Sequence, residues 1–308
     1  MELFKSKTTI DFVGKQNYAI ALSSLLILIT LISLVAHGGP RYGIDFAGGV
    51  LVQVKFSQPV TAAEIKEKLK PINMEESLVQ EFEEKGENEF LIHYSKEDID
   101  IEISQQALTK ALTDGFGADQ FEIRRVESVG PKVGKDLRNK GLWAVALSWL
   151  LMLVYVAFRF EFGFGVGGII ALAHDVIITL GAFSLANKEI DLTIVASFLT
   201  IVGFSINDTI VIFDRVRENR RKYSEPLPQL INRSVNETLS RTIITTGTVL
   251  MGVLALFIFG GGVIHDFAFA MLVGCISGTY STLYIASPFV IFWDRFTTQR
   301  ARGRKSSK

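Results

Sequence analysis

The sequence predicts a polytopic α-helical membrane protein with six transmembrane helices and one α+β ferredoxin-like domain outside the cytoplasm, between the first helix and the second. Apolar residues make up 48% of the 308 and are gathered into six stretches with few charges. Each stretch is close to the roughly 20 residues that a helix needs to cross a bilayer. One polar segment, residues 37–140, separates the first stretch from the other five.

The six apolar stretches are expected to be helices, because a helix satisfies its own backbone hydrogen bonds where water is absent. They are Tyr18 to Ala36, Gly141 to Phe158, Phe162 to Asn187, Leu192 to Phe213, Thr242 to Val263 and Phe267 to Trp293. A cleaved signal peptide is the alternative for the first, but its 19 uncharged residues and the lack of an A-x-A site argue against this. The single cysteine, Cys275, excludes an intrachain disulfide.

The distribution of basic residues indicates the orientation. With the N-terminus inside, the inner segments hold 17 Lys and Arg, whereas the two short outer loops hold only Lys188. The other 14 lie in residues 37–140, and long segments are largely exempt from the positive-inside rule. Both termini are therefore expected in the cytoplasm, and residues 37–140 outside.

The polar segment has the pattern of a small α+β domain. The expected elements are strand Val50 to Phe56, helix Thr61 to Leu69, strand Leu78 to Phe82, strand Glu89 to Tyr94, helix Ile101 to Leu112 and strand Gln120 to Val126. A β-α-β-β-α-β order is the ferredoxin-like arrangement. The glycine-rich flanks, 38–49 and 129–141, are expected to be hinges or close-packing joints.

Three further segments have a composition that predicts their place. The inner loop 214–241 contains apolar residues at helical spacing, which predicts a short amphipathic helix on the membrane surface; its sequons at Asn232 and Asn236 are attributed to chance. The basic tail, 295–308, is expected to be disordered and suited to anionic headgroups. Glycine and serine crowd the third and sixth helices, which predicts close packing inside the bundle.

Ionisable side chains within the apolar stretches are the functional candidates, because a charge in a bilayer core costs at least about 2.5 kcal/mol. His174 and Asp175 lie in the third stretch and Asp208 in the fourth. Arg241 opens the fifth and is followed at helical spacing by Thr245. We interpret Arg241 as the ionic partner of Asp208; the alternative is an anchor that reaches the headgroups.

Enzymatic function is not expected. An aspartyl pair of Asp175 and Asp208, or a serine protease at Ser205, would be the candidates, but the glycines that such sites usually carry beside these residues are absent. The sequence contains no phosphate-binding loop, metal-ligand cluster or nucleotide fingerprint. No cofactor is therefore expected, and the energy source would be an ion gradient.

Several motifs together resemble the SecF branch of the SecD/SecF family of bacterial protein-export membrane proteins, within the resistance-nodulation-division superfamily. The resemblance covers about residues 10–294. The motifs are Gly43 to Gly49 (GIDFAGG), Ser128 to Pro131 (SVGP), His174 to Val176 (HDV), Ser205 to Thr209 (SINDT), Phe213 to Asn219 (FDRVREN) and Asn236 to Thr242 (NETLSRT).

This resemblance implies a fold, partners and site residues. It implies an accessory subunit of the Sec translocase in the bacterial inner membrane, which pairs with SecD beside the SecY, SecE and SecG channel, often with YajC. The pair would use the proton motive force to promote export of unfolded preproteins; lipid, but no nucleic acid, would be its other partner. Asp208, Arg241 and Thr245 match the proton-conducting positions, and Gly43, Asp45, Gly48 and Gly49 the structural glycine motif.

Two other functions compete with this one. The first is a proton-coupled exporter of small amphiphiles, since the wider superfamily contains such pumps, although these usually have twelve helices and two outer domains in one chain. The second is a passive scaffold for the translocon, in which Asp208 is only structural.

Overall fold

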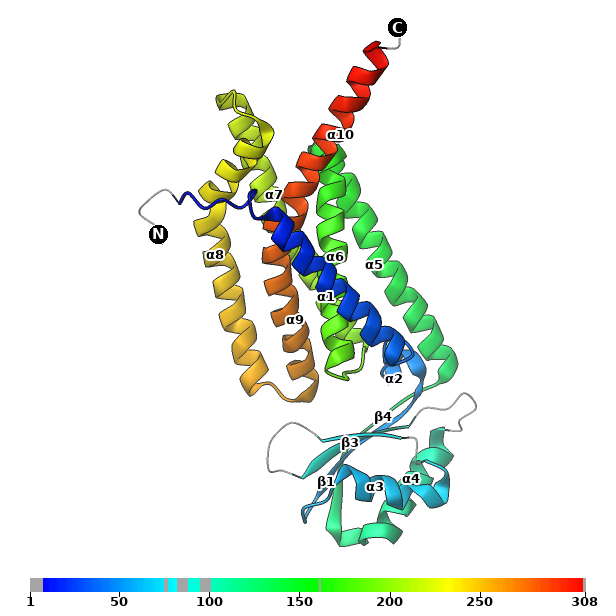
Figure 1. Ribbon diagram of the computed structural model, residues 1–308. Helices are drawn as coiled ribbons and strands as arrows, with labels where there is room; N and C mark the ends of the chain where they lie inside the picture. The colour runs from blue at the N-terminus through cyan, green and yellow to red at the C-terminus, as the bar shows by residue number, and fades with distance from the viewer. Residues whose placement is uncertain (1–7, 75–76, 82–87, 95–100, 161, 307–308) are drawn as a thin grey trace.

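The protein consists of a helical bundle with a small α+β domain at one end (Figure 1). The structure is a computed structural model that describes residues 8–74, 77–81, 88–94, 101–160 and 162–306. Within these residues, six helices are long and apolar enough to cross a membrane. The prediction of six membrane helices with a domain after the first is thus confirmed in its coarse form.

The membrane helices contain most of each predicted stretch, but α5, α7, α8 and α10 extend beyond the predicted limits. They are α1 (Gln16–Ala36), α5 (Pro131–Arg159), α6 (Phe162–Leu185), α7 (Leu192–Lys222), α8 (Leu227–Phe259) and the continuous run of α9 (Gly262–Ser281), the π-helical turn η3 (Thr282–Ala286) and α10 (Ser287–Ser306). The widened turn η3 precedes Pro288, which has no N–H to donate to the carbonyl four residues earlier. Ser287 instead donates its hydroxyl to the Thr282 carbonyl, 3.1 Å away.

The inner loop differs from its prediction. Instead of a loop with a separate surface helix, α7 and α8 both extend beyond the span and are joined by residues 223–226 alone. No helix-breaking residue separates the amphipathic segment from the apolar stretch that follows, so one helix runs through both. The apolar side chains expected on the membrane surface are buried. Ile231, Val235 and Leu239 share one core with Phe12 and Phe213, and Leu230 is buried as well.

The basic tail also differs from its prediction. The helix α10 continues to Ser306, so residues 300–306 are helical and not disordered. Lysine and arginine are good helix formers, and their charges interact favourably with the C-terminal end of the helix dipole.

The α+β domain contains every element that the sequence predicts. These are β1 (Gly49–Phe56), α3 (Ala62–Leu69), η1 (Lys70–Ile72), β2 (Leu78–Glu81), β3 (Glu89–Tyr94), α4 (Ile101–Phe116), η2 (Ala118–Gln120) and β4 (Phe121–Val129). The strands form one antiparallel sheet in the order β2-β3-β1-β4. Alternate residues of β1 pack with α3 and α4 into a closed core, including Val52, Val54, Ile65 and Leu112. The opposite face of the sheet is turned toward the bundle (Figure 1).

Small residues let the central helices approach closely, as predicted for the bundle interior. A Cβ at Gly274 of α9 would lie 2.2 Å from the Ile201 side chain on α7, and one at Gly278 would lie 3.0 Å from Ser205. On α6, a Cβ at Gly167 would lie 3.1 Å from the Ala286 carbonyl. These residues therefore pack within the chain, and they do not by themselves indicate a partner.

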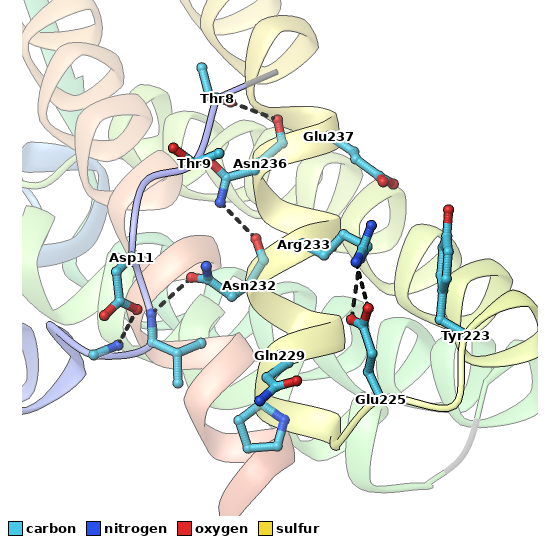
Figure 2. Close-up of a pocket in the computed structure, with 13 residues that line it drawn as sticks. Thr8, Thr9, Asp11, Tyr223, Glu225, Gln229, Asn232, Arg233, Asn236 and Glu237 are labelled. Atoms are coloured by element: carbon cyan, nitrogen blue, oxygen red, sulfur yellow. Dashed lines mark hydrogen bonds and ion pairs between the residues drawn. The ribbon is translucent and has the colours of Figure 1, made fainter. Parts of the chain in front are cut away.

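The N-terminal segment is held by two asparagines of α8, which we call the asparagine clasp (Figure 2). The Asn236 side chain accepts from Ile10 N at 2.9 Å and donates to Ile10 O at 2.8 Å. The Asn232 side chain accepts from Phe12 N at 2.8 Å and donates to Ile10 O at 3.1 Å. The two sequons thus have a structural use, because their amides pair with backbone groups that lie just before α1.

Candidate functional site

The most buried polar cluster of the bundle surrounds Asp175 of α6, which has no exposed surface. Its carboxylate accepts hydrogen bonds from Ser277 at 2.7 Å and from Ser205 and Ser281 at 2.8 Å each. These serines come from α7 and α9, so one carboxylate joins three helices. One turn further along α6, the hydroxyl of Thr179 donates to the backbone carbonyl of Asp175 at 2.8 Å.

His174 extends the cluster to α1. Its Nδ1 lies 3.1 Å from Asp175 Oδ1, and its Nε2 lies 3.1 Å from the hydroxyl of Ser23 on α1. The imidazole also stacks on Tyr280, whose hydroxyl donates to the Ala19 carbonyl of α1. A continuous set of hydrogen bonds therefore connects α1, α6, α7 and α9 within the span.

Asp208 is a second buried acidic residue of the bundle, on α7. Its side chain is 2% exposed, and its Oδ2 has no hydrogen-bond partner among the residues that the structure describes. A buried, unpartnered carboxylate oxygen costs free energy, so a native structure that keeps one usually has a functional reason for it.

The direct ion pair that we expected between Asp208 and Arg241 is not formed. Across the described parts of the chain, no hydrogen bond or salt bridge joins the two, and Arg241 is exposed on α8. Arg241 acts on Asp208 only through space, as a nearby positive charge. Thr245 is half-buried and donates to the Arg241 and Thr242 carbonyls of its own helix, at 2.9 and 3.1 Å. The structure therefore brings these three residues into one region, but within the described residues no hydrogen bond or ion pair joins Asp208 to Arg241 or to Thr245.

The sequence did not identify the hydroxyl partners of Asp175. Ser205, three residues before Asp208 in α7, donates its hydroxyl to Asp175. Ser277 and Ser281 lie four residues apart in α9, and this spacing of polar residues in an apolar stretch is the signal that could have revealed them.

The glycine motif forms the joint between the domain and the bundle. The short helix α2 (Ile44–Ala47) lies against the start of α5, where a Cβ at Gly134 would be 2.9 Å from Gly48 N. Gly43 N donates to Ile190 O at 3.0 Å, and Asp45 accepts from Leu192 N at 3.0 Å. Gly48 and Gly49 both have positive φ, at 75° and 127°, which favours glycine.

A side-chain contact strengthens this joint. His93 on β3 lies with its Nδ1 2.7 Å from the Glu189 carboxylate, in the connection between α6 and α7. Lys188 in the same connection pairs with Asp266 of α9 at 2.6 Å. The open face of the sheet is thus fixed to the connection between α6 and α7, which is itself paired with α9.

Asp191, at the N-cap of α7, is the titratable group of the joint. Burial raises its pKa from 3.8 to about 6; the hydrogen bond from Ile194 lowers it, and the charges of Asp45 and Asp266 raise it. A carboxyl group whose pKa is higher in the folded state binds more protons there than in the unfolded state between pH 4 and 6. The free energy of unfolding therefore falls as pH rises through this window.

We expect Asp191→Asn to remove this component of the pH dependence. Asparagine caps a helix as well as aspartate does but does not ionise, so the variant should be more stable than wild type above pH 6, by about 1 to 2 kcal/mol. Thermal unfolding of the purified protein at pH 5, 6 and 7.5 measures this difference. Asp191→Ala, which also loses the cap, should be less stable than Asp191→Asn at every pH. Parallel pH profiles for wild type and Asp191→Asn would contradict the assignment.

Two known families match this chain. The family described as protein export membrane protein SecD/SecF, C-terminal, matches residues 108–295. The SecD/SecF GG motif matches residues 33–60, which include the joint glycines.

Individual relatives match over nearly the whole chain. The protein translocase subunit SecF of Magnetococcus marinus is 43% identical over 96% of this chain and 95% of its own. That of Desulfurispirillum indicum is 42% identical, covering 92% of this chain and 91% of its own. That of Vibrio alginolyticus is 40% identical, covering 94% and 91%.

The fold matches two crystal structures of SecDF. The first, a translocon-associated membrane protein from Thermus thermophilus, is 35% identical with a TM-score of 0.83 over 95% of this chain. The second, in a super-membrane-facing form, is 35% identical with a TM-score of 0.71 over 98% of this chain. This chain spans only 40% and 41% of those two chains.

Proposed function

The chain belongs to the SecD/SecF family of protein-export membrane proteins, and we propose that it is the SecF-type accessory subunit of a Sec translocase that uses the proton motive force to promote preprotein export. The observation that carries the proposal is Asp208, a buried residue whose Oδ2 atom has no hydrogen-bond partner among the residues that the structure describes. An intramembrane carboxylate of this kind is expected to bind and release the coupling ion.

In the proposed cycle, the charge of Asp208 controls how α7 and α8 pack. When Asp208 is ionised, the nearby Arg241 is attracted to it; when a proton neutralises it, that attraction is lost. Each charge that crosses the membrane releases about 2.3 kcal/mol per 100 mV, which is enough to bias a two-state arrangement. The cluster around Asp175 and His174 would transmit the change to α1, which leads into the ferredoxin-like domain.

We propose SecD as the partner that completes the site. In the described part of the chain Asp208 Oδ2 has no hydrogen-bond partner and Arg241 is exposed, so an acidic group from a second subunit would be placed to pair with Arg241. The crystal structures that resemble this chain are SecDF chains, of which it spans about 40%. The SecY, SecE and SecG channel, YajC and the unfolded preprotein are the further proposed partners.

We place the protein in the bacterial inner membrane, with both termini in the cytoplasm and the domain in the periplasm. The 17 basic residues on the inner side against one on the short outer loops support this orientation. The α7–α8 extension and the end of α10 then lie together at the cytoplasmic end of the bundle, opposite the domain (Figure 1).

Asp208→Asn is expected to assemble with its partner yet to lose gradient-dependent export. The substitution keeps the shape of the side chain and fixes it in the neutral state. The measurement is secretion of a precursor in cells depleted of the native subunit, with and without an uncoupler. Asn207→Ala, which changes the exposed neighbour, is the matched control and should export normally.

The result distinguishes the proposed proton-driven export subunit from the two alternative functions, a passive scaffold and an exporter of small amphiphiles. Wild-type export by an assembled Asp208→Asn complex would favour the passive scaffold. Normal precursor export together with loss of resistance to amphiphilic drugs would favour the small-molecule exporter.

A further inference from the structure

Three arginines meet at a hollow on the cytoplasmic edge of the bundle. The cavity has a volume of about 270 Å³ and lies between the end of α5, the start of α6 and the inner part of α7. It is lined by Arg159, Phe160, Phe164, Val216, Arg217 and Arg220. Arg217 and Arg220 are three residues apart and therefore lie on one face of α7.

Two of the three arginines, Arg159 and Arg217, have guanidinium donors that no residue described by the structure occupies fully. Arg217 is exposed and makes no ion pair or hydrogen bond with any residue that the structure describes. Arg159 reaches Asp214 only at 3.5 Å, at the limit of a hydrogen bond. The planar fork of donors on arginine matches the oxygens of a phosphate group, so the cavity is suited to a phosphate or another oxyanion.

The floor and the rim of the cavity are apolar. The Arg159 guanidinium lies 5.3 Å from the centre of the Phe160 ring, which packs against Phe213, and Phe164 lies beneath. The exposed face of α5 that ends beside Arg159 consists of large apolar side chains, including Leu151, Val154, Tyr155 and Phe158. Phe158 is 95% exposed, the highest value among the large apolar residues of the chain that the structure describes.

The anion site lies at the end of the exposed apolar face that α5 presents within the membrane span. This combination suits an amphiphilic ligand, which has a charged head and an apolar tail. We propose that this cavity binds the phosphate of an anionic phospholipid, with the acyl chains along the exposed face of α5. Basic pockets between helices on the cytoplasmic side are a known means of binding such headgroups. The positive-inside rule explains why arginines lie on this side, but it does not require three of them to converge on one hollow with an aromatic floor.

The proposal is tested by cross-linking at the site itself. A photoreactive amino acid replaces Phe158 in the complex purified from native membranes, which is then reconstituted into vesicles with labelled phosphatidylglycerol or phosphatidylcholine. We expect about tenfold more adduct with phosphatidylglycerol, because its headgroup has a net negative charge, whereas the choline of phosphatidylcholine carries a positive charge that the arginines repel. The double variant Arg159→Gln, Arg217→Gln should lose at least fivefold of the phosphatidylglycerol adduct.

The matched control removes the same charge from the same end of the bundle. Arg221→Gln with Lys222→Gln changes exposed residues of α7 that do not line the cavity, and its adduct yield should stay within twofold of wild type. Equal losses in the two double variants would overturn the proposal in favour of a diffuse positive surface. Abolition of the preference by inorganic phosphate would overturn it in favour of a soluble anion. Arg217→Gln alone, which breaks no described interaction, repeats the comparison if the double variant accumulates poorly.

Discussion

Replacement of Asp175 by alanine is expected to destabilise the protein severely. The carboxylate accepts from three serine hydroxyls at 2.7 to 2.8 Å and lies 3.1 Å from His174, all of them buried. Alanine leaves these groups without their acceptor in an apolar interior, where each unsatisfied group costs about 1 to 3 kcal/mol. Interhelical hydrogen bonds in membranes contribute on average only about 0.6 kcal/mol each. Most of the loss therefore comes from the hydroxyl and imidazole groups left without an acceptor, and the free energy of unfolding should fall by on the order of 3 to 6 kcal/mol.

Thermal unfolding of the purified protein and its level in membranes measure the effect. We expect the midpoint to fall by about 10 °C or more. Asp175→Asn is the matched control: it retains one acceptor oxygen and the shape of the side chain, and serine hydroxyls can rotate to accept from the amide, so its loss should be much smaller. If Asp175→Ala unfolded at the wild-type temperature, the cluster would not hold the helices together.

The second large effect is expected at the joint, for Gly48→Ala. The residue has φ of +75°, and a Cβ there would lie 2.8 Å from Pro131 Cα and 3.2 Å from Val129 O. A non-glycine residue in this region is strained by about 1 to 3 kcal/mol, and the overlap adds to this because backbone atoms cannot rotate away. We expect a loss on the order of 3 kcal/mol or more, with separation of the domain from the bundle.

Cross-linking across the joint reports this separation. Cysteines in place of His93 and Glu189, whose side chains touch in the native joint, should be joined efficiently by a short thiol reagent in an otherwise wild-type chain. Gly48→Ala should reduce the yield severalfold. Gly39→Ala is the control. Its φ of +120° makes an alanine strained there too, but no atom lies within 4 Å of the added Cβ, so the steric overlap is absent. Equal yields in the two variants would show that the close approach of Gly48 to Pro131 does not hold the joint.

The sequence predicts the membrane helices and the α+β domain well, because both depend on local hydrophobic patterns. It places the helix ends less well where a helix continues beyond the apolar stretch. The charged residues Arg233 and Glu237 argue against a membrane span, yet both lie within the unbroken helix α8. The strands of the domain were predicted to within a few residues because β1 alternates strictly between its two faces.

The site was harder to predict because its contacts are distant in the sequence. His174 and Asp175 stand out as charges in an apolar stretch, but their partners Ser23 and Ser277 lie about 150 and 100 residues away. Charge alone also suggested a contact between Asp208 and Arg241, whereas side-chain direction on α8 leaves Arg241 exposed. A periodic pattern fixes which face a residue occupies, but not which neighbour it meets.

The asparagine clasp has a consequence for how the chain is made. The backbone of Ile10 and Phe12 leaves the ribosome before the asparagines that bind it, which follow 226 and 220 residues later. By then α1, α5, α6 and α7 have already been synthesised, so the clasp closes only when α8 emerges. Until that moment this segment is bonded to water, and Phe12 lacks the residues that α8 contributes to its core, Ile231, Val235 and Leu239. Closure of the clasp therefore marks a late event in biogenesis, in which a segment translated before α1 reaches its native place only after α8 has been made.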